Sequence, residues 1–513
     1  MTFAYNEPLY FAGFLPAVVF VYQFCPKKFR WLVLLLANYA FFFIWSKWLL
    51  VYNLISVVIT FVFGRILGNM KKAPEGVDKK AFKKKKNRIM TLGILLNLGI
   101  LVVLMYTNFI GTNLAALFSF EFEKVSWVIP IGISYYTLQS ISYLVDVKNR
   151  KLEPADKIYK LALYMSFFAT IMQGPITAYG DVGEDLCAGH DITYSNLAVG
   201  FERILLGMFK KVMIADHLAP AVKVLFMNYT NDGAMALMAA VLCTLQLYMD
   251  FAGTIDIAIG SGKIFGVTLA ENFRQPFFAK NASEFWRRWH MTLGVFLRTY
   301  IFYPVSLSKP VQKITKWTKN HLGKKAARFV GPLIALFCVW ICNGLWHGPY
   351  WTYILYGMYY FVIIFIELLM EDPVKRFNEK FHLDENGWGW RLFRFIKLFF
   401  LVIIGEMFFM APDFATGWQM FVSIFTNFHI SSVAENYLSL SIGVHDYIIV
   451  AVGYIMIFIW GVLKETNYPL REKFEKLSTP VRWSFLYAVI MAVILFGAYG
   501  PGYDAVAMLY AGF

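Results

Sequence analysis

The chain has 513 residues, of which 58% are hydrophobic and 19% aromatic, and its mean hydropathy is +0.54. Soluble proteins have roughly 45–50% apolar residues, so this composition excludes an ordinary soluble domain. The net charge of +15 does not indicate nucleic-acid binding, because cytoplasmic loops of membrane proteins collect Lys and Arg and no nucleic-acid-binding module is recognisable.

Long apolar runs determine the predicted fold class. Backbone groups in lipid must be satisfied internally, which leaves helices or closed barrels, and runs of roughly 20 residues favour helices. The sequence therefore predicts an all-α polytopic plasma-membrane protein. The positive-inside rule gives about 10–12 transmembrane and re-entrant helices, with both termini extracytoplasmic. The five cysteines show neither disulfide nor metal spacing.

Residues 1–124 are predicted to form N-terminal transmembrane helices. A basic run at residues 65–88 contains Glu75 and Asp78 among many Lys residues. The positive-inside rule places this run in the cytoplasm, where it serves as a topology signal at anionic lipid or as a docking site for an acidic partner. Met1–Tyr10 has no Lys or Arg, unlike a cleavable signal peptide, so the first apolar run is expected to stay in the membrane.

Residues 125–370 are predicted to form the catalytic core. Crossings are expected at Trp127–Val145 and Tyr159–Gln173, followed by an outer or re-entrant segment, Gly174–Phe201. Charged side chains interrupt the apolar turns between residues 160 and 308 and leave the number of crossings there open. Because such helices cannot all face lipid, we expect short, tilted or re-entrant helices around an internal cavity. Residues 371–513 are predicted to form C-terminal transmembrane helices.

Two of the eight histidines, His290 and His347, lie in apolar surroundings and directly follow a tryptophan. His347 is expected to end a helix, because Gly348 favours a left-handed cap and Pro349 prevents continuation. Nineteen helical residues from the preceding basic loop, at about 1.5 Å each, nearly span the hydrocarbon core. His347 should therefore be reachable from the outer side.

The position of His347 at a helix C-terminus favours a protonated imidazole, which suits a general base. Asn343, one turn earlier, is placed to orient the ring. The alternative is a core histidine bonded to a neighbouring carbonyl, and position alone does not decide between the two.

His290 is predicted to lie on a helix that begins near Asn281. Glu284 and Arg288, one turn apart, are expected to form a salt bridge on one stripe of this helix. The other stripe of the predicted helix contains Ser283, Trp286, His290 and Gly294.

Asp250 and Asp256 do not resemble a catalytic carboxylate pair, because residues at this spacing on a helix point in different directions. Pairing with Arg or with backbone amides is the favoured interpretation. Structural pairing is the favoured interpretation for the arginines, and the alternative for Arg298 is a contact with an anionic donor group. No phosphate-cradling loop, serine nucleophile or metal-ligand cluster is found. The residues predicted to line a substrate path are Trp286, Arg298, Trp346 and Asp250.

Several stretches in order along residues 125–365 resemble the membrane-bound O-acyltransferase family. The resemblance is to its bacterial branch, which includes the membrane components of alginate O-acetylation and teichoic-acid D-alanylation. The matching stretches are Pro130–Gln139 with Ser142–Asp146, Gln173–Ile176, Gly207–Asp216, Tyr248–Gly253, Glu271–Phe273, Glu284–His290 and Asn343–Gly348.

The resemblance implies a ring of tilted helices around a thin central tunnel region. It also implies that His347 is the catalytic histidine and His290 a second, tunnel-lining histidine. The implied reaction moves an activated acyl group from a cytoplasmic carrier to a hydroxyl outside the membrane. No bound cofactor is expected, and the donor is expected to be a thioester of an acyl-carrier protein or of coenzyme A.

The sequence therefore predicts an O-acyltransferase acting on a cell-surface polysaccharide or teichoic acid, with acetyl favoured over D-alanyl. Predicted roles are general base for His347, donor positioning or proton relay for His290, and orientation of the ring for Asn343. The basic segment Lys309–Arg328 is either a landing site for an acidic acyl-carrier protein or a solvated cytoplasmic loop. The alternatives are a polysaccharide or lipid transporter, and a scaffold that passes acyl groups to an external transferase.

Overall fold

The computed structural model describes residues 5, 7, 9–76, 78–384, 387–499 and 503. Within these residues all regular secondary structure is helical, as the sequence predicts. The contacts divide the chain into two compact units. The first unit is Met1–Ile204, Ile255–Ala270 and Tyr510–Phe513, and the second is Leu205–Thr254 and Glu271–Leu509. Both chain ends, which the sequence predicts to be extracytoplasmic, lie outside the described residues.

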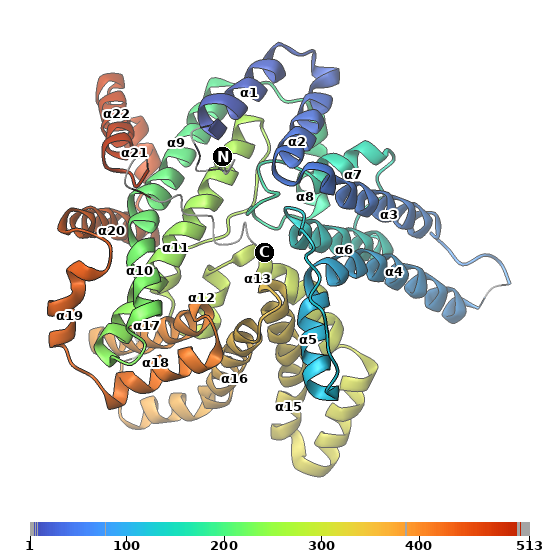
Figure 1. The fold of residues 1–513 in the computed structure, drawn as a ribbon. Coiled ribbons are helices and arrows are strands. Elements are labelled where there is room, and N and C mark those ends of the chain that lie inside the picture. Colours follow the sequence, from blue (N-terminus) through green and yellow to red (C-terminus); the bar gives the residue numbers. More distant parts are fainter. Residues whose placement is uncertain are drawn as a thin grey trace. The chain divides into compact units, whose positions relative to one another are not determined.

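The first unit contains the N-terminal helices (Figure 1). Helices α9 and α11 pass from one unit to the other. The elements are η1 (Tyr10–Phe14), α1 (Leu15–Phe24), η2 (Lys27–Phe29), α2 (Arg30–Ser46), η3 (Lys47–Leu49), α3 (Leu50–Asn69), α4 (Lys79–Leu101), η4 (Val102–Tyr106), α5 (Thr107–Phe118), α6 (Ile133–Asn149), α7 (Ile158–Met165), α8 (Tyr179–Ala188), α9 (Tyr194–Lys210) and α11 (Gly233–Ile264).

Two predicted crossings in this unit are shorter than expected. Helix α6 begins at Ile133, not near Trp127, because Pro130 lacks an N–H and Gly132 has a φ of +70° at the helix start. Helix α7 ends at Met165, and the chain up to Gln173 is buried without forming an α-helix. The expected crossing at Tyr159–Gln173 is therefore wrong in its second half.

Buried asparagines explain how α7 can end inside the unit. Helix ends leave carbonyls without intrahelical partners. Asn38 on α2 donates to the Leu163 carbonyl at 3.2 Å, and Asn53 on α3 donates to the Met165 carbonyl at 3.1 Å. These bonds satisfy the last turn of α7 and connect it to two long apolar helices.

The second unit contains the remaining helices. Its elements besides the first part of α11 are η5 (Lys211–Ala215), α10 (Asp216–Asn228), η6 (Pro276–Phe278), α12 (Ala282–Arg288), α13 (Met291–Leu297), η7 (Arg298–Phe302), α14 (Tyr303–Ser306), α15 (Lys309–His347), α16 (Trp351–Lys380), α17 (Trp388–Met410), α18 (Phe414–Thr426), α19 (Ser431–Asn436), η8 (Tyr437–Ser439), α20 (Val444–Glu465), α21 (Leu470–Glu475) and α22 (Thr479–Phe496).

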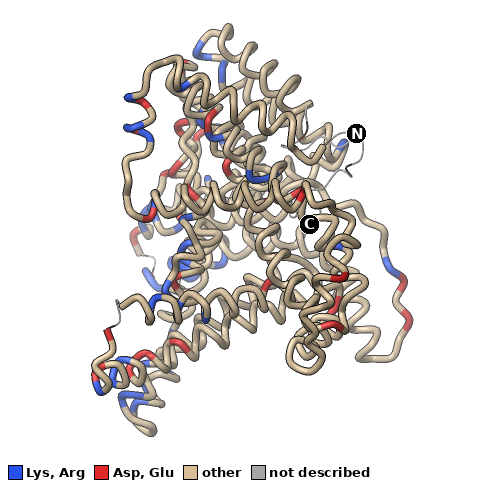
Figure 2. The backbone as a smooth tube through the Cα atoms, turned by 90° about the vertical axis from the view of Figure 1, so that its left-hand side faces the viewer, with Lys and Arg blue, Asp and Glu red and all other residues tan. Residues whose placement is uncertain are grey.

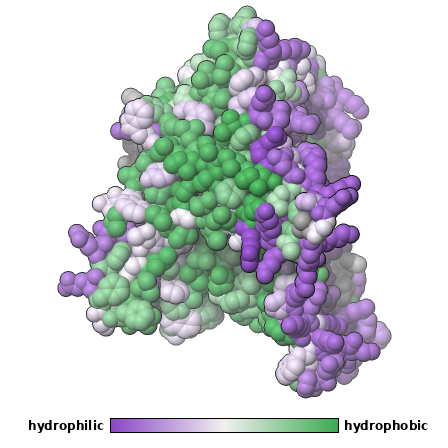
Figure 3. All heavy atoms as spheres, turned by 90° about the vertical axis from the view of Figure 1, so that its right-hand side faces the viewer, coloured by the Kyte–Doolittle hydropathy of each residue, from purple (hydrophilic) through white to green (hydrophobic). Residues whose placement is uncertain are grey.

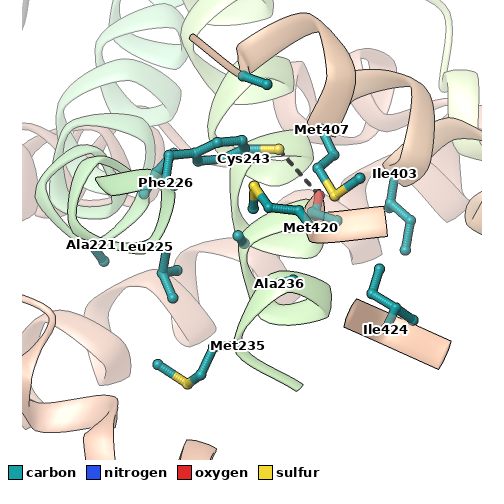
Figure 4. Packing of buried hydrophobic residues seen from close by; sticks show 14 of the residues in the cluster. Ala221, Leu225, Phe226, Met235, Ala236, Cys243, Ile403, Met407, Met420 and Ile424 are labelled. Atoms are coloured by element: carbon teal, nitrogen blue, oxygen red, sulfur yellow. Dashed lines mark hydrogen bonds between the residues drawn. The ribbon is translucent and has the colours of Figure 1, made fainter. Parts of the chain in front are cut away.

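One apolar cluster holds α17 in place within the second unit. Figure 4 shows Ile403 and Met407 of α17 among buried side chains of α10, α11 and α18, including Phe226, Cys243 and Met420. Because lipid is as apolar as these side chains, close packing rather than exclusion from water stabilises such a cluster. This packing holds α17 against α10, α11 and α18.

Helices α15 and α16 pack closely because glycines face the neighbouring backbone. A Cβ on Gly344 would lie 2.5 Å from the Tyr353 carbonyl oxygen, and one on Gly357 would lie 2.3 Å from that of Trp340. Small residues allow this approach between membrane helices. Helix α15 also contains a break at Gly323, whose φ is +88°. The basic first part, residues 309–322, and the mostly apolar second part, residues 324–347, are therefore separate helices.

Seven helical stretches of the described chain are long and apolar enough to cross a membrane. In Figure 2, Lys and Arg gather in a few segments and long stretches of the tube have none. The surface in Figure 3 is hydrophobic over a broad area, with hydrophilic side chains collected along one side. The protein is thus an all-α, multi-pass membrane protein, while the tunnel and the orientation of the chain stay predictions. The helical stretches are Lys27–Asn69, Lys79–Phe118, Gly233–Ile264, Lys309–His347, Trp351–Lys380, Val444–Glu465 and Thr479–Phe496.

Candidate active site

His347 is the last residue of α15, as the sequence predicts, and its side chain is buried. Gly348 has a φ of +148° and a ψ of 175°, so it uses a glycine-specific extended conformation in place of the expected left-handed cap. Aromatic rings from α16 and α17 contact the imidazole. Their centroids lie 5.2 Å (Phe409), 6.0 Å (Tyr356) and 6.1 Å (Tyr353) from that of His347.

His290 does not lie within the continuous helix that its spacing predicts. Helix α12 ends at Arg288, and His290 has φ +47° and ψ +48° as the residue that precedes α13. The expected stripe that joins Trp286, His290 and Gly294 is therefore wrong, because the chain turns between two short helices. A non-glycine residue in this region costs free energy, and such strain is concentrated at functional sites.

The hydrogen bonds of Asn272 assign the tautomer of His290. Asn272 Oδ1 accepts from the Thr292 N–H at 3.0 Å and from the Thr292 hydroxyl at 2.9 Å, and it lies 3.3 Å from His290 Nδ1. Since this oxygen is an acceptor, Nδ1 carries the proton and Nε2 keeps its lone pair. Burial, followed by the nearby His347, lowers the pKa of His290 well below its usual value, so the ring is neutral.

Trp346 lies between the two histidines. Its ring centroid is 5.3 Å from that of His290 and 5.0 Å from that of His347. Trp286 is connected to the same group of rings through Tyr356, whose ring centroid lies 6.2 Å from that of Trp286 and 6.0 Å from that of His347. The structure thus brings together both predicted histidines and both predicted tryptophans in the second unit.

The other predicted site residues are arranged differently. Asn343 is buried near His347 on α15, but these two described residues make no hydrogen bond with each other, so its orienting role stays a prediction. Arg298 is exposed at the start of η7. Asp250 forms a 2.5 Å ion pair with Lys211, and Asp256 pairs with Arg203 at 2.7 Å. The two aspartates point to different partners, as their spacing predicts.

The predicted ion pair between Glu284 and Arg288 is present, at 2.8 Å, and Glu465 of α20 extends it. Arg288 bonds both carboxylate oxygens of Glu465, at 2.8 and 3.0 Å. Burial opposes ionisation of Glu284, but the Lys280 N–H and the Arg288 guanidinium outweigh it and lower the pKa of this carboxyl. This network holds α12 against the end of α20, and His290 follows α12 directly along the chain.

Several buried polar atoms near the histidines have no hydrogen-bond partner among the described residues. Such atoms are rare in folded proteins and costly unless water or a ligand satisfies them. They mark this region as a site that receives a polar group. The atoms are His290 Nε2, Asn343 Oδ1, Trp286 Nε1 and Asn272 Nδ2.

Sequence reasoning missed two buried ionisable residues. Lys211 is fully buried between Asp250 and Asp216, at 2.5 and 2.6 Å. Glu406 is fully buried on α17 and accepts a 2.8 Å hydrogen bond from Tyr356. The available signal was the same for both, since an ionisable residue inside an apolar run marks a functional or paired position. In the described part of the chain no group of three or more His, Cys, Asp or Glu could hold a metal ion.

Comparisons with known proteins add an independent line of evidence. Residues 154–411, half of the chain, match the model of the membrane-bound O-acyltransferase family, MBOAT. The chain is 29% identical over 92% of its length to a probable alginate O-acetylase AlgI of Azotobacter vinelandii, and covers 87% of that protein. It is 28% identical to a peptidoglycan O-acetyltransferase of Helicobacter pylori, over 73% of this chain and 72% of the relative. A teichoic acid D-alanyltransferase of Bacillus subtilis is 28% identical over 54% of this chain and 69% of its own length.

Proposed function

The chain belongs to the membrane-bound O-acyltransferase family, and on this premise we propose that it acylates hydroxyls of an extracytoplasmic surface polymer with His347 as general base. It is a multi-pass membrane O-acyltransferase. The acyl donor in this proposal is a cytoplasmic thioester, carried by an acyl-carrier protein or by coenzyme A, and the acceptor is a polysaccharide or a teichoic acid outside the membrane.

The observation that carries the proposal is the pairing of the two imidazoles around one indole. His347 and His290 are buried, and the ring of Trp346 meets both. Buried ionisable side chains in a membrane protein are expensive and are kept for function. An alcohol is a weak nucleophile at neutral pH, and a positioned imidazole is the usual group that activates it.

The proposed reaction transfers the acyl group in two steps. The acceptor oxygen attacks the thioester carbonyl carbon while a ring nitrogen of His347 takes the hydroxyl proton. The tetrahedral intermediate then collapses, the carbon–sulfur bond breaks, and the protonated ring returns the proton to the leaving sulfur. The products are an ester and a free thiol, and His347 ends in its starting state.

His290 supports this step through its unprotonated Nε2 in the proposal. A buried lone pair with no hydrogen-bond partner among the described residues can accept a hydrogen bond from the acceptor hydroxyl or from a water in a proton relay. Asn272 holds the opposite nitrogen. This arrangement supports a positioning or relay role for His290, distinct from that of His347.

Acetyl is the favoured acyl group. The probable alginate O-acetylase of A. vinelandii matches 92% of the chain, whereas the D-alanyltransferase of B. subtilis matches 54%. An acetyl group also needs no charged pocket, while a D-alanyl group brings an ammonium that requires an acceptor. A separate external acyltransferase that completes the transfer belongs to the scaffold alternative and is not part of this proposal.

The experiment compares surface polymers from cells with and without the gene for this protein. Base-releasable acetate and D-alanine are measured together with the total polymer at the surface. The proposal predicts that one ester disappears while polymer export is unchanged, and the missing ester names the donor. Loss of polymer with unchanged ester per unit of polymer would instead support transport. Esterification that requires an added external transferase with purified protein would support the scaffold.

A further inference from the structure

Glu406 is the one ionisable residue among the last residues of α17, Leu398–Met410. Its side chain is completely buried. Ile403 and Met407 of the same helix pack in the apolar cluster of Figure 4, which holds α17 against its neighbours. A buried carboxyl in such a helix is costly and therefore calls for a functional explanation.

The carboxyl of Glu406 has one partner and one open oxygen. The Tyr356 hydroxyl donates to Oε1 at 2.8 Å. Oε2 has no hydrogen-bond partner among the described residues, and no described Lys, Arg or His forms an ion pair with this carboxyl. The hydrogen bond from Tyr356 is thus the main constraint that Glu406 exerts on its surroundings.

Tyr356 connects this carboxyl to the catalytic imidazole. The ring of Tyr356 stands perpendicular to that of His347, at 89° and 6.0 Å between centroids. Phe409, one helical turn after Glu406 on α17, contacts both rings, at 5.0 Å from Tyr356 and 5.2 Å from His347. Glu406 and Phe409 therefore act on the same pair of rings from one face of α17.

We propose that Glu406 is a positioning residue for acyl transfer, which fixes the Tyr356 ring against the His347 imidazole by accepting the Tyr356 hydroxyl. The inference rests on the proposed role of His347. Without the hydrogen bond, the tyrosine ring loses one of the interactions that hold it edge-on to the imidazole. The edge-to-face interaction between the two rings, when it is abolished, corresponds to about a tenfold change in rate.

The test measures the initial rate of ester formation on surface polymer, per molecule of protein in the membrane. Glu406→Leu and Tyr356→Phe are each expected to lower this rate about tenfold, and the double variant is expected to be no slower than either single variant. Glu406→Gln is expected to keep the wild-type rate, because its amide oxygen still accepts from Tyr356.

Tyr359→Phe is the matched control. The Tyr359 hydroxyl donates to the Leu401 carbonyl at 2.7 Å, so this variant also removes a hydrogen bond between α16 and α17, but away from His347. It is expected to keep the wild-type rate. Rate reductions that multiply in the double variant, or an equal reduction in Tyr359→Phe, would show that Glu406 only joins helices.

Tyr356→Phe at the wild-type rate would overturn the inference even if Glu406→Leu fails to accumulate. The role of Glu406 and the proposed function can fail independently, and His347→Ala distinguishes the two cases. If His347→Ala abolishes the ester while Glu406→Leu retains it, only the role of Glu406 fails. If His347→Ala also retains the ester, the proposed function fails with it.

Discussion

His290 and His347 contact the same indole, that of Trp346, although they come from different segments of the chain. One lies at a turn between two short helices and the other at the end of a long one. Their proximity depends on how α13 and α15 pack within the second unit. Two histidines that are weak signals separately become a site through this shared indole.

Because His290 has a left-handed backbone conformation, different substitutions there are expected to affect stability and activity differently. His290→Asn should keep the fold, because Asn tolerates the left-handed conformation, but should lower ester formation by about tenfold or more through loss of the imidazole. His290→Val should in addition destabilise the protein by about 1–2 kcal/mol. Thermal unfolding in detergent and the ester assay check both effects. Equal unfolding temperatures for Asn and Val variants would contradict the assigned conformation.

Replacement of Lys211 is expected to destabilise the protein strongly, and neutralising its two aspartate partners is expected to restore stability. Lys211→Met leaves Asp216 and Asp250 buried without their shared cation, which should cost about 3–5 kcal/mol and remove most protein from the membrane. The triple variant with Asp216→Asn and Asp250→Asn should recover the protein level. A single Lys211→Met variant at the wild-type level would show that Lys211 is not needed to neutralise these carboxyls.

Loss of one partner of Arg288 is expected to lower the free energy of unfolding by less than the loss of Lys211. Glu465→Gln weakens a half-buried bidentate pair and should lower the free energy of unfolding by about 1 kcal/mol. Arg471→Gln breaks an exposed pair with Glu475 on α21 and serves as the control, with little expected change. The two variants are compared by thermal unfolding in one detergent. An equal effect at both positions would contradict the structural role of Glu465.

The lysines in the basic first part of α15 are expected to bind an acidic acyl-carrier protein, the proposed donor. Lys309, Lys313 and Lys316 are exposed and follow helical spacing, so they present charge on one face. Their replacement by Glu should slow ester formation most at low ionic strength, because charge complementarity mainly accelerates association. Reversal of Lys83 and Lys84 on α4 is the control. Equal effects of both reversals would favour a general lipid interaction instead.

The helical class and much of the site could be predicted from sequence because their signals are local. Apolar runs of membrane length predict helices, and Gly348 with Pro349 predicts the end of α15 at His347. The i, i+4 spacing of Glu284 and Arg288 predicts their ion pair. Each of these inferences needs only residues that are close along the chain.

The sequence did not predict features that depend on contacts between residues far apart in the chain. Periodicity alone extended one helix through His290, whereas Asn272 binds Thr292 across the turn and stabilises a break. Helix α7 ends early because asparagines of α2 and α3 satisfy its carbonyls. The apolar run around Glu406 marks this residue, but its hydrogen bond from Tyr356 on another helix could not be predicted from spacing. Sequence spacing does not contain these relationships.

The most direct test of the account compares His347→Ala with His429→Ala, a change at an exposed histidine outside the site. Base-releasable acetate and D-alanine on surface polymers are measured in cells with equal membrane levels of each variant. One ester is expected to fall by at least about a hundredfold in His347→Ala and to stay at the wild-type level in His429→Ala. Wild-type amounts of both esters in the His347→Ala cells would contradict the assignment of His347 as general base.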